Sequence, residues 1–249
     1  MTTKLDQSDK WFSCAPHDGE HYQSVLKRFH GAFKPATYLE IGTAEGKTLE
    51  LAKCATVAVD PFFQISTNVV GNKPSCQFFQ MTSDDFFAHH KLDVLLGGRI
   101  EFAFLDGMHL FEYLLRDFMN TEKYSKKTST LFMHDCIPTD SYLARRDPDD
   151  LTLSYVSPHV MWWAGDVWKV VAILKKYRPE LRILAFDAPP TGLISITNLA
   201  PDSCFLSENY DEIIREFSII ENDRESLQKY WESLEIIDTK LELPRYAPG

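Results

Sequence analysis

The fold class of this chain is best inferred from the stretch between Tyr38 and Asp60. Its pattern of apolar residues and glycines predicts a strand, a turn, a helix and a second strand, in that order. Gly42 opens the turn and lets the backbone bend sharply, while Gly46 would let the following helix, residues 47–53, pack close to the first strand. The second strand ends at Asp60, where nucleotide-binding units of parallel α/β sheets carry an acid that meets a ribose diol.

The turn lacks the marks of a phosphate-binding loop. The fingerprint G-x-G-x-x-G would need a glycine at Ala44, and the loop G-x-x-x-x-G-K-[ST] would need one at Ile41. Glu40 and Glu45 flank the turn, and carboxylates there would repel a pyrophosphate, which binds bare N–H groups and positive charge. Acids at Glu40 and Asp60 better suit a cationic ligand that carries a ribose.

Glu40-x-Gly42-x-x-x-Gly46, followed by Asp60, resembles the cofactor motif of class I S-adenosylmethionine-dependent methyltransferases. The ammonium, sulfonium and ribose of S-adenosylmethionine match the acids of this motif. The resemblance implies that Glu40, Gly42, Thr43 and Gly46 surround the methionine part of the cofactor and that Asp60 contacts its ribose. The alternative is a plain strand–turn–helix unit without a ligand.

Strands and helices continue to alternate after this unit. Two late strands are joined through Pro189 and Pro190 without a helix, which suits an antiparallel hairpin. The expected fold is therefore an α/β, three-layer, Rossmann-like methyltransferase sheet of seven mostly parallel strands with an antiparallel closing hairpin. The further strands are predicted at residues 76–79, 101–105, 128–133, 181–186 and 192–197, and helices at residues 20–33, 109–124, 165–177 and 209–237.

We expect one domain over residues 1–249, a length that suits a single α/β domain with additions. The additions are an N-terminal lead-in at residues 1–17, a lid insertion at residues 137–164 and a C-terminal helical extension at residues 207–249. The lid insertion is long and rich in prolines and aromatic residues, and long excursions of this kind are usually functional or mobile.

The lid insertion has two interpretations. Its aromatic residues and arginines could wall an acceptor and clamp a carboxylate or phosphate. Alternatively, the tryptophans pack in the core, and Arg145 and Arg146 are solvated and balance the charges of Asp147, Asp149 and Asp150. We favour this second interpretation for the arginines. The residues concerned in the first interpretation are Tyr142, Arg145, Arg146, Tyr155, His159, Trp162 and Trp163.

Nearly every predicted parallel strand ends in an acid or a histidine. Because ligands of open α/β sheets lie beyond the carboxyl ends of the strands, these endings together predict one polar site. Ser83 and Asp84 follow the third strand, where the resemblance implies adenine contacts, but they fit an ordinary helix N-cap equally well. The polar strand endings are Glu40 with Gly42, Asp60, Ser83 with Asp84, Asp106 to His109, and His134 with Asp135.

Asp106-Gly107-Met108-His109 and His134-Asp135 resemble a branch of small-molecule O-methyltransferases that includes macrocin-type and family 24-like methyltransferases. The resemblance implies that Asp106 and Asp135 bind a metal ion, with His134 as a third ligand. Mg²⁺ prefers carboxylate oxygens and would lower the pKa of an acceptor hydroxyl, whereas a histidine shifts the preference toward a softer divalent cation.

The catalytic candidates are His109, His134 and Asp106. Without a metal ion, either histidine could act as a general base, because its unperturbed pKa lies near neutrality. Each histidine, taken alone, fits a helix cap or a core hydrogen bond equally well.

Composition argues against several classes of partner. The content of 44% hydrophobic and 25% charged residues is ordinary for a globular protein. A net charge of −10 and a pI near 5.3 argue against sequence-independent binding to nucleic acid or to an anionic membrane surface. No stretch approaches the roughly 20 apolar residues of a membrane span, and residues 1–10 do not resemble a signal peptide.

The 5 cysteines contain no C-x-x-C pair, so neither a disulfide framework nor a zinc ribbon is expected, and a cytoplasmic location follows most simply. The sequence thus predicts a methyltransferase that uses S-adenosylmethionine to methylate a hydroxyl oxygen of a small polar acceptor. Two alternatives stay open: a non-catalytic cofactor-binding protein of the same fold, and a nicotinamide-dependent oxidoreductase. The second is less favoured, because Ala44 stands where the dinucleotide fingerprint needs a glycine. Self-association into a homo-oligomer is also open.

Overall fold

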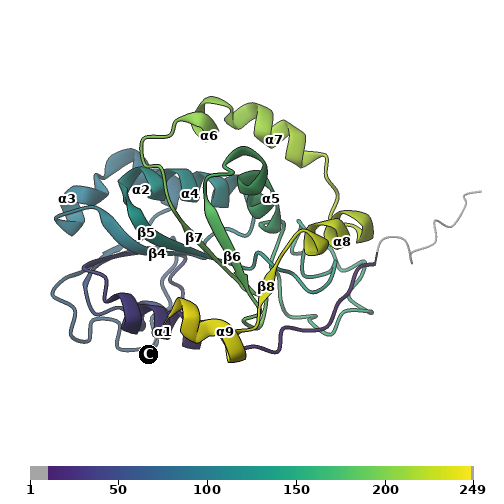
Figure 1. Ribbon diagram of the computed structural model, residues 1–249, viewed down its shortest axis with the longest axis horizontal. Helices are drawn as coiled ribbons and strands as arrows, with labels where there is room; N and C mark the ends of the chain where they lie inside the picture. Colours follow the sequence, from purple (N-terminus) through teal and green to yellow (C-terminus); the bar gives the residue numbers. More distant parts are fainter. Residues whose placement is uncertain (1–10, 248–249) are drawn as a thin grey trace, which may run out of the picture.

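The computed structural model describes residues 11–247. Residues 1–10 of the predicted lead-in and the last two residues of the predicted extension lie outside the described residues. An eight-stranded sheet forms the middle layer, in the order β3-β2-β1-β4-β5-β7-β6-β8 (Figure 1). Its strands are β1 (Thr37–Ile41), β2 (Ala55–Val59), β3 (Cys76–Phe79), β4 (Ile100–Leu105), β5 (Ser125–His134), β6 (Arg182–Phe186), β7 (Leu193–Thr197) and β8 (Ile236–Ile237).

Helices cover both faces of the sheet. In Figure 1, α1 and α9 lie on one face, α2, α4 and α5 lie on the other, and α7 packs outside α5. The helices are α1 (Tyr22–Phe33), α2 (Ser83–His89), α3 (Leu92–Leu96), α4 (Phe111–Tyr124), α5 (Trp168–Tyr177), α6 (Phe205–Glu208), α7 (Tyr210–Ser218), α8 (Arg224–Glu232) and α9 (Thr239–Tyr246), with a short 3₁₀ turn, η2 (Leu49–Leu51).

The strand pairing confirms the predicted three-layer α/β sheet with its antiparallel closing hairpin. Strands β1 to β5 pair in parallel, whereas β7 runs antiparallel to both β5 and β6. The chain builds outward from β1 to β3 and then returns to place β4 on the other side of β1. The order of the strands therefore reverses between β1 and β4, and open α/β sheets bind ligands at such a switch point.

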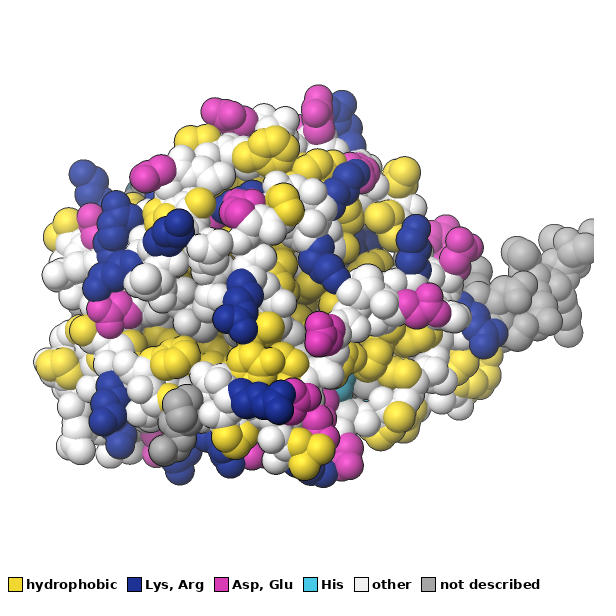
Figure 2. All heavy atoms as spheres, in the orientation of Figure 1, with side chains coloured by type: hydrophobic (Ala, Val, Ile, Leu, Met, Phe, Trp, Pro, Cys, Tyr) yellow, Lys and Arg dark blue, Asp and Glu magenta, His cyan; other side chains and the backbone are white. Residues whose placement is uncertain are grey.

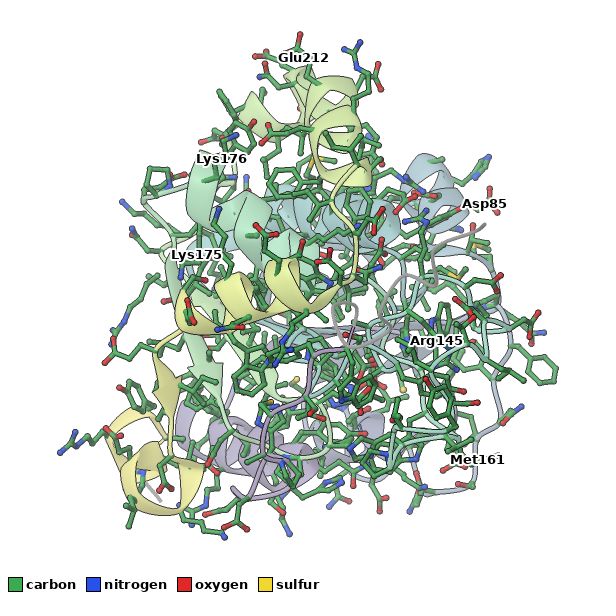
Figure 3. All side chains as sticks on the ribbon, turned by 90° about the vertical axis from the view of Figure 1, so that its right-hand side faces the viewer. Asp85, Arg145, Met161, Lys175, Lys176 and Glu212 are labelled. Atoms are coloured by element: carbon green, nitrogen blue, oxygen red, sulfur yellow. The ribbon has the colours of Figure 1, made fainter. Side chains whose placement is uncertain are left out.

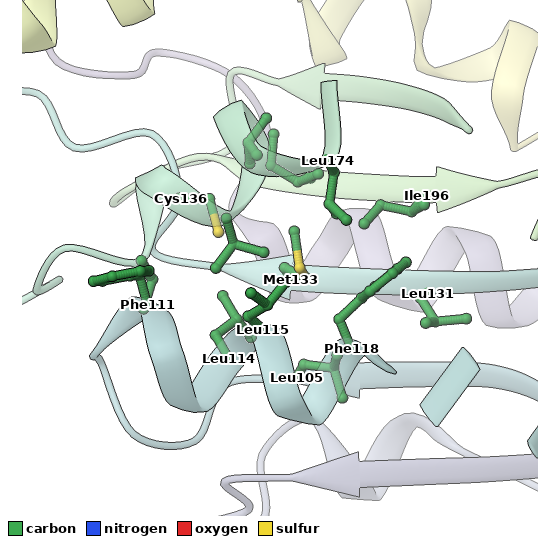
Figure 4. Packing of buried hydrophobic residues seen from close by; sticks show 14 of the residues in the cluster. Leu105, Phe111, Leu114, Leu115, Phe118, Leu131, Met133, Cys136, Leu174 and Ile196 are labelled. Atoms are coloured by element: carbon green, nitrogen blue, oxygen red, sulfur yellow. The ribbon is translucent and has the colours of Figure 1, made fainter. Parts of the chain in front are cut away.

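The sheet is buried on both faces, as near-continuous apolar strands require. Leu39 and Ile41 of β1 belong to the core beneath α4 and α5, whereas Tyr38 points to the core beneath α1. Figure 4 shows the first of these cores, in which side chains of α4 pack onto β4 and β5. The labelled residues there include Leu114, Leu115 and Phe118 of α4 and Leu105, Leu131 and Met133 of the sheet.

The helix predicted over residues 47–53 is wrong in extent, because only the 3₁₀ turn η2 forms. Gly46 has a φ of +82°, and Ala52 is already extended at φ −70° and ψ 143°, so few residues remain for helical turns. The N–H groups of Leu51 and Ala52 bond three residues back, to the carbonyls of Thr48 and Leu49, which is 3₁₀ geometry.

The C-terminal region also differs from its prediction. The single helix expected over residues 209–237 is two helices, α7 and α8, and the Asp223 side chain caps α8 by accepting a hydrogen bond from the Ser226 N–H. Ile236 and Ile237 then form β8, parallel to β6, so the sheet has an eighth strand that was not predicted. These two β-branched residues favour the extended backbone at the open edge of the sheet.

Residues 137–164 form an irregular segment that packs closely on the body through buried residues 142–144. Arg146 forms ion pairs with Glu112 and Asp166. The Arg145 guanidinium lies 3.8 Å from the ring centre of Tyr142 and donates to backbone carbonyls within the segment. Among the described residues, neither arginine forms an ion pair with Asp147, Asp149 or Asp150, and both guanidinium groups are already occupied.

The outer surface of this segment is apolar in places. Met161 lies at its edge (Figure 3) and is 91% exposed. Elsewhere, on the face shown in Figure 2, lysine and arginine side chains are scattered among acidic and apolar ones. No helix in residues 11–247 is both long and apolar enough to cross a membrane.

Gly42 should be required for the junction of β1 with β4. Its φ is +81°, and a Cβ atom there would come within 1.9 Å of the Asp106 carbonyl oxygen. We expect Gly42→Ala to lower the free energy of unfolding by about 2 kcal/mol or more. Gly31→Ala is the matched control, because nothing lies within 4 Å of a Cβ atom at Gly31 in α1 and alanine favours helix. Urea unfolding of both variants measures this, and equal stabilities would contradict the close approach.

Candidate functional site

Four predicted residues meet at the carboxyl ends of β4 and β5, and we call them the Asp–His cluster: Asp106, His109, His134 and Asp135. The parallel pairing of β4 with β5 brings these ends together. His134 Nδ1 lies 3.3 Å from Asp106 Oδ1 and 3.5 Å from Asp135 Oδ1. His109 Nε2 lies 3.1 Å from Asp135 Oδ2 and 3.6 Å from Asp106 Oδ1. Each imidazole therefore sits between the two carboxylates.

His109 is oriented by its other ring nitrogen. Nδ1 lies 2.7 Å from the carbonyl oxygen of Trp163, and because a carbonyl can only accept, Nδ1 must carry the proton. Gly165 makes this approach feasible, since a Cβ atom there would come within 1.7 Å of the His109 carbonyl oxygen. The end of the irregular segment thus holds His109 with Nε2 facing the two aspartates.

His134 and Asp135 are held by neighbours from two other elements. The ring of Tyr22, in the first turn of α1, lies 4.1 Å from the ring of His134 between centroids. The Thr191 hydroxyl donates to Asp135 Oδ1. The backbone of Asp135 has a φ of +59°, in the left-handed region that costs energy for residues other than glycine. Asp135 is therefore a non-glycine residue kept in a strained conformation at the centre of the cluster.

Opposite charges stabilise one another inside the cluster. Burial acts to lower the pKa of His109, but Asp135 and Asp106 outweigh it and raise that pKa to about 9. Burial likewise opposes the charge of His134, and the same two aspartates raise its pKa to about 10. Burial would raise the pKa of both aspartates, but the imidazoles lower it below its usual range. Two positive and two negative groups thus balance at neutral pH.

Several atoms of the cluster are available to coordinate a ligand. Asp106 Oδ1 and both ring nitrogens of His134 are buried without a hydrogen-bond partner among the described residues. One ligand atom from each of Asp106, His134 and Asp135 lies within 4.8 Å of the others, so these residues could hold a metal ion. Two carboxylates with one imidazole suit Mg²⁺ or Mn²⁺, or a softer divalent cation. The structure therefore brings together the three predicted metal ligands.

A cavity of about 830 Å³ opens above the switch point between β1 and β4. Of the predicted site residues, Gly42, Thr43, Asp106 and His134 line it, whereas His109 and Asp135 do not. His159 and Trp162 of the irregular segment also line it, as the acceptor-wall interpretation of that segment predicts. Other lining residues come from elements that the sequence did not connect with the site: His17 of the lead-in, His21 at the N-cap of α1, Tyr22 of α1, and Pro189 and Pro190 of the hairpin.

The predicted cofactor acids make contacts within the protein. Glu40 lies beneath the turn, where its Oε2 accepts from the Tyr38 hydroxyl at 2.6 Å and its Oε1 has no partner among the described residues. Burial raises the pKa of Glu40 to about 8. Glu45 pairs with Lys47. The expected attraction of a cation by an acid-lined turn is therefore weaker than the sequence suggested, because one acid is buried and the other is paired.

Asp60 is used by the backbone of the turn. Its Oδ2 accepts from the Ala44 N–H at 2.8 Å, and its Oδ1 accepts from the Phe62 N–H at 2.7 Å. Gly46 does not line the cavity, and a Cβ atom there would meet the Val69 side chain at 2.4 Å rather than the first strand. Both residues thus shape the turn from behind.

Ser83 and Asp84 do not line the cavity either. Arg116 of α4 donates to both carboxylate oxygens of Asp84, at 2.8 and 2.6 Å. The N-cap of α2 is Thr82, whose hydroxyl accepts from the Asp85 N–H. The stretch therefore begins a capped helix, with Thr82 as the N-cap and Ser83 and Asp84 in its first turn, and the Asp84 carboxylate is paired with α4.

No family model and no curated protein matches this sequence. Solved structures similar to the chain include the S-adenosylhomocysteine-bound methyltransferase PaMTH1 of Podospora anserina, at 13% identity over 71% of this chain and 77% of that chain, with a TM-score of 0.47. An O-methyltransferase from Bacillus cereus in complex with S-adenosylhomocysteine is similar at 11% identity over 73% and 83% of the two chains, with a TM-score of 0.45. The O-methyltransferase TomG of Streptomyces achromogenes is similar at 10% identity over 72% and 80%, also with a TM-score of 0.45.

The buried Glu40 should make the protein less stable as pH rises. Its pKa is about 8 in the folded chain, against an ordinary value of 4.5, so the folded state binds the proton more tightly and loses stability as that proton dissociates. The original chain should lose free energy of unfolding between pH 6 and pH 8, whereas Glu40→Gln should not lose this contribution. We therefore expect the free energy of unfolding of Glu40→Gln to rise by about 1 kcal/mol or more relative to that of the original chain over this range. Urea unfolding across this range measures the difference. Parallel stability profiles would mean that Glu40 stays charged in the fold.

Proposed function

We propose that this chain is an S-adenosylmethionine-dependent methyltransferase that methylates a hydroxyl oxygen of a small polar acceptor. One observation carries the proposal: the cavity at the switch point is bordered on one side by the glycine turn after β1 and on the other by Asp106 and His134. A nucleoside-type cofactor suits the turn, and an acceptor oxygen suits the cluster. A volume of about 830 Å³ is within the usual range for sites that bind small molecules.

The turn side offers polar groups that lack partners. Thr43 Oγ1 and Glu40 Oε1 are buried without hydrogen-bond partners among the described residues. Buried polar atoms of this kind are costly unless a ligand or water satisfies them. An ammonium group above the turn would supply donors to both oxygens and would favour the charged form of Glu40. These two unsatisfied oxygens support a cationic adenosyl donor. The support does not come from exposed carboxylates along the turn, as the sequence had suggested.

On the acceptor side, Asp106, His134 and Asp135 would hold a divalent cation, and His134 would release its extra proton as the ion binds, because only a neutral imidazole can act as a ligand. Such an ion, when bound, lowers the pKa of an acceptor hydroxyl. His109 would not be a ligand, because its two nitrogens already face Trp163 and the aspartates. Its role would be to fix the carboxylates and to balance their charge.

The surrounding residues would orient the acceptor and exclude water. Tyr22 covers one face of His134, and His159 stacks on Trp162 at 5.3 Å between ring centroids. Methyl transfer needs an in-line approach of oxygen and methyl carbon in a dry site, and aromatic walls provide the positioning. The arginines of the irregular segment would play no part in binding, because their guanidinium groups are engaged elsewhere.

Calorimetry with S-adenosylhomocysteine tests the cofactor assignment. We expect the chain to bind S-adenosylhomocysteine and to ignore NADH and ATP, and we expect Thr43→Val to weaken that binding about fivefold through loss of one hydrogen bond. Thr152→Val is the control, because Thr152 lies in the exposed part of the irregular segment. Binding of NADH or ATP without binding of S-adenosylhomocysteine would overturn the proposal.

A further inference from the structure

Four consecutive backbone carbonyls follow Asp135, and each accepts a hydrogen bond from a group outside the sheet. We call residues 136–139 the post-strand segment. Three of the donors are side chains and one is a backbone N–H. The bonds run from Tyr230 Oη to Cys136 O at 2.7 Å, from His17 Nε2 to Ile137 O at 2.9 Å, from Trp231 Nε1 to Pro138 O at 2.8 Å, and from Cys14 N to Thr139 O at 3.0 Å.

The donors come from the two ends of the chain. Tyr230 and Trp231 are adjacent residues of α8, and His17 belongs to the lead-in, which passes beside α8 in Figure 1. His17 stacks on Trp231, with ring centroids 5.5 Å apart and an interplanar angle of 18°, and Phe12 packs against the same indole. The lead-in and α8 therefore form one packed unit against the post-strand segment.

This arrangement leaves Asp135 no freedom to relax. His134, on its amino side, is held in the β5–β7 ladder opposite Leu193. On its carboxyl side, the post-strand segment is fixed by the four hydrogen bonds, and the Ile137 N–H donates to the carbonyl of Thr191. A single residue between two fixed segments must take the φ and ψ angles that join them. For Asp135 these include the left-handed φ of +59°, which an aspartate in a free loop would leave for a cheaper conformation.

The left-handed conformation also carries the side chain to its partners. Asp135 Oδ2 lies 3.1 Å from His109 Nε2, and Oδ1 accepts from the Thr191 hydroxyl. We propose that Tyr230, Trp231 and His17 are positioning residues, which hold Asp135 in the conformation that places its carboxylate in the Asp–His cluster. The site is then incomplete without helix α8. This inference rests on the proposed function in one respect, because it assigns to Asp135 the role of a metal ligand.

The test uses the full chain and two variants that each remove one donor and keep a ring, Tyr230→Phe and Trp231→Phe. Trp168→Phe is the matched control. It also removes an indole donor next to α8, since the rings of Trp168 and Tyr230 lie 5.0 Å apart between centroids, but its Nε1 donates to Asn222 and not to the post-strand segment. Asp135→Asn serves as the reference for loss of the carboxylate itself.

Two readouts are measured, Mn²⁺ affinity by calorimetry and amide hydrogen exchange at Ile137. We expect Tyr230→Phe and Trp231→Phe each to weaken Mn²⁺ binding about tenfold, the usual effect of losing support for a ligand, and to speed exchange at Ile137. Trp168→Phe should leave both unchanged even if it lowers the melting temperature.

The outcomes separate the inference from the proposed function. If the Tyr230 and Trp231 variants melt earlier but keep Mn²⁺ affinity and Ile137 exchange, α8 only packs against the body and the inference is overturned. If the original chain does not bind Mn²⁺, the metal assignment fails. Exchange at Ile137 then decides the inference alone: faster exchange in the two variants supports the positioning of Asp135, and unchanged exchange refutes it.

Discussion

The mutual neutralisation of two aspartates and two histidines at the ends of β4 and β5 is the interaction on which the rest of the site depends. A buried carboxylate without a partner would cost several kcal/mol, and a second one beside it would cost more. His109 and His134 remove this cost by lying between the two aspartates. Asp106 Oδ1 and the ring nitrogens of His134 make no hydrogen bond to another described residue, so these atoms can turn to a ligand that replaces their ion pairs.

Much of the surrounding structure serves to keep this cluster in place. Gly42 permits β1 to approach Asp106, Gly165 permits the irregular segment to reach His109, and Thr191 reaches across from the hairpin to Asp135. The two ends of the chain meet over the post-strand segment through Tyr230, Trp231 and His17. Residues far apart in the sequence thus converge on one carboxylate with a strained backbone, and strain of this kind gathers at functional sites.

The sequence was most informative where local pattern decides structure. The strands around Tyr38 and Phe104 could be predicted because apolar runs between turns leave few alternatives. Asp106, His109, His134 and Asp135 could be predicted to meet, because the carboxyl ends of neighbouring parallel strands lie at one edge of a sheet. The extent of η2 and the existence of β8 could not, since both depend on how a short connection fits a sheet that is already formed.

The roles of single carboxylates were less predictable. Asp60 has the spacing of a ribose-binding acid, yet its oxygens accept from Ala44 and Phe62, and no spacing rule reveals which backbone N–H a side chain will reach. Glu40 was expected at the ligand, and it is buried beneath the turn with Oε2 bonded to the Tyr38 hydroxyl, which leaves only Oε1 for a ligand. Tyr230 carries no local signal, because only the packing of α8 brings it to Cys136.

A crystal structure of the chain with S-adenosylhomocysteine and Mn²⁺ tests the central claim most directly. We expect adenosyl density beside Gly42 and Thr43 and an anomalous peak bounded by Asp106, His134 and Asp135. An anomalous peak elsewhere, or an Asp–His cluster that keeps its internal ion pairs while the cofactor analogue binds outside this cavity, would contradict it.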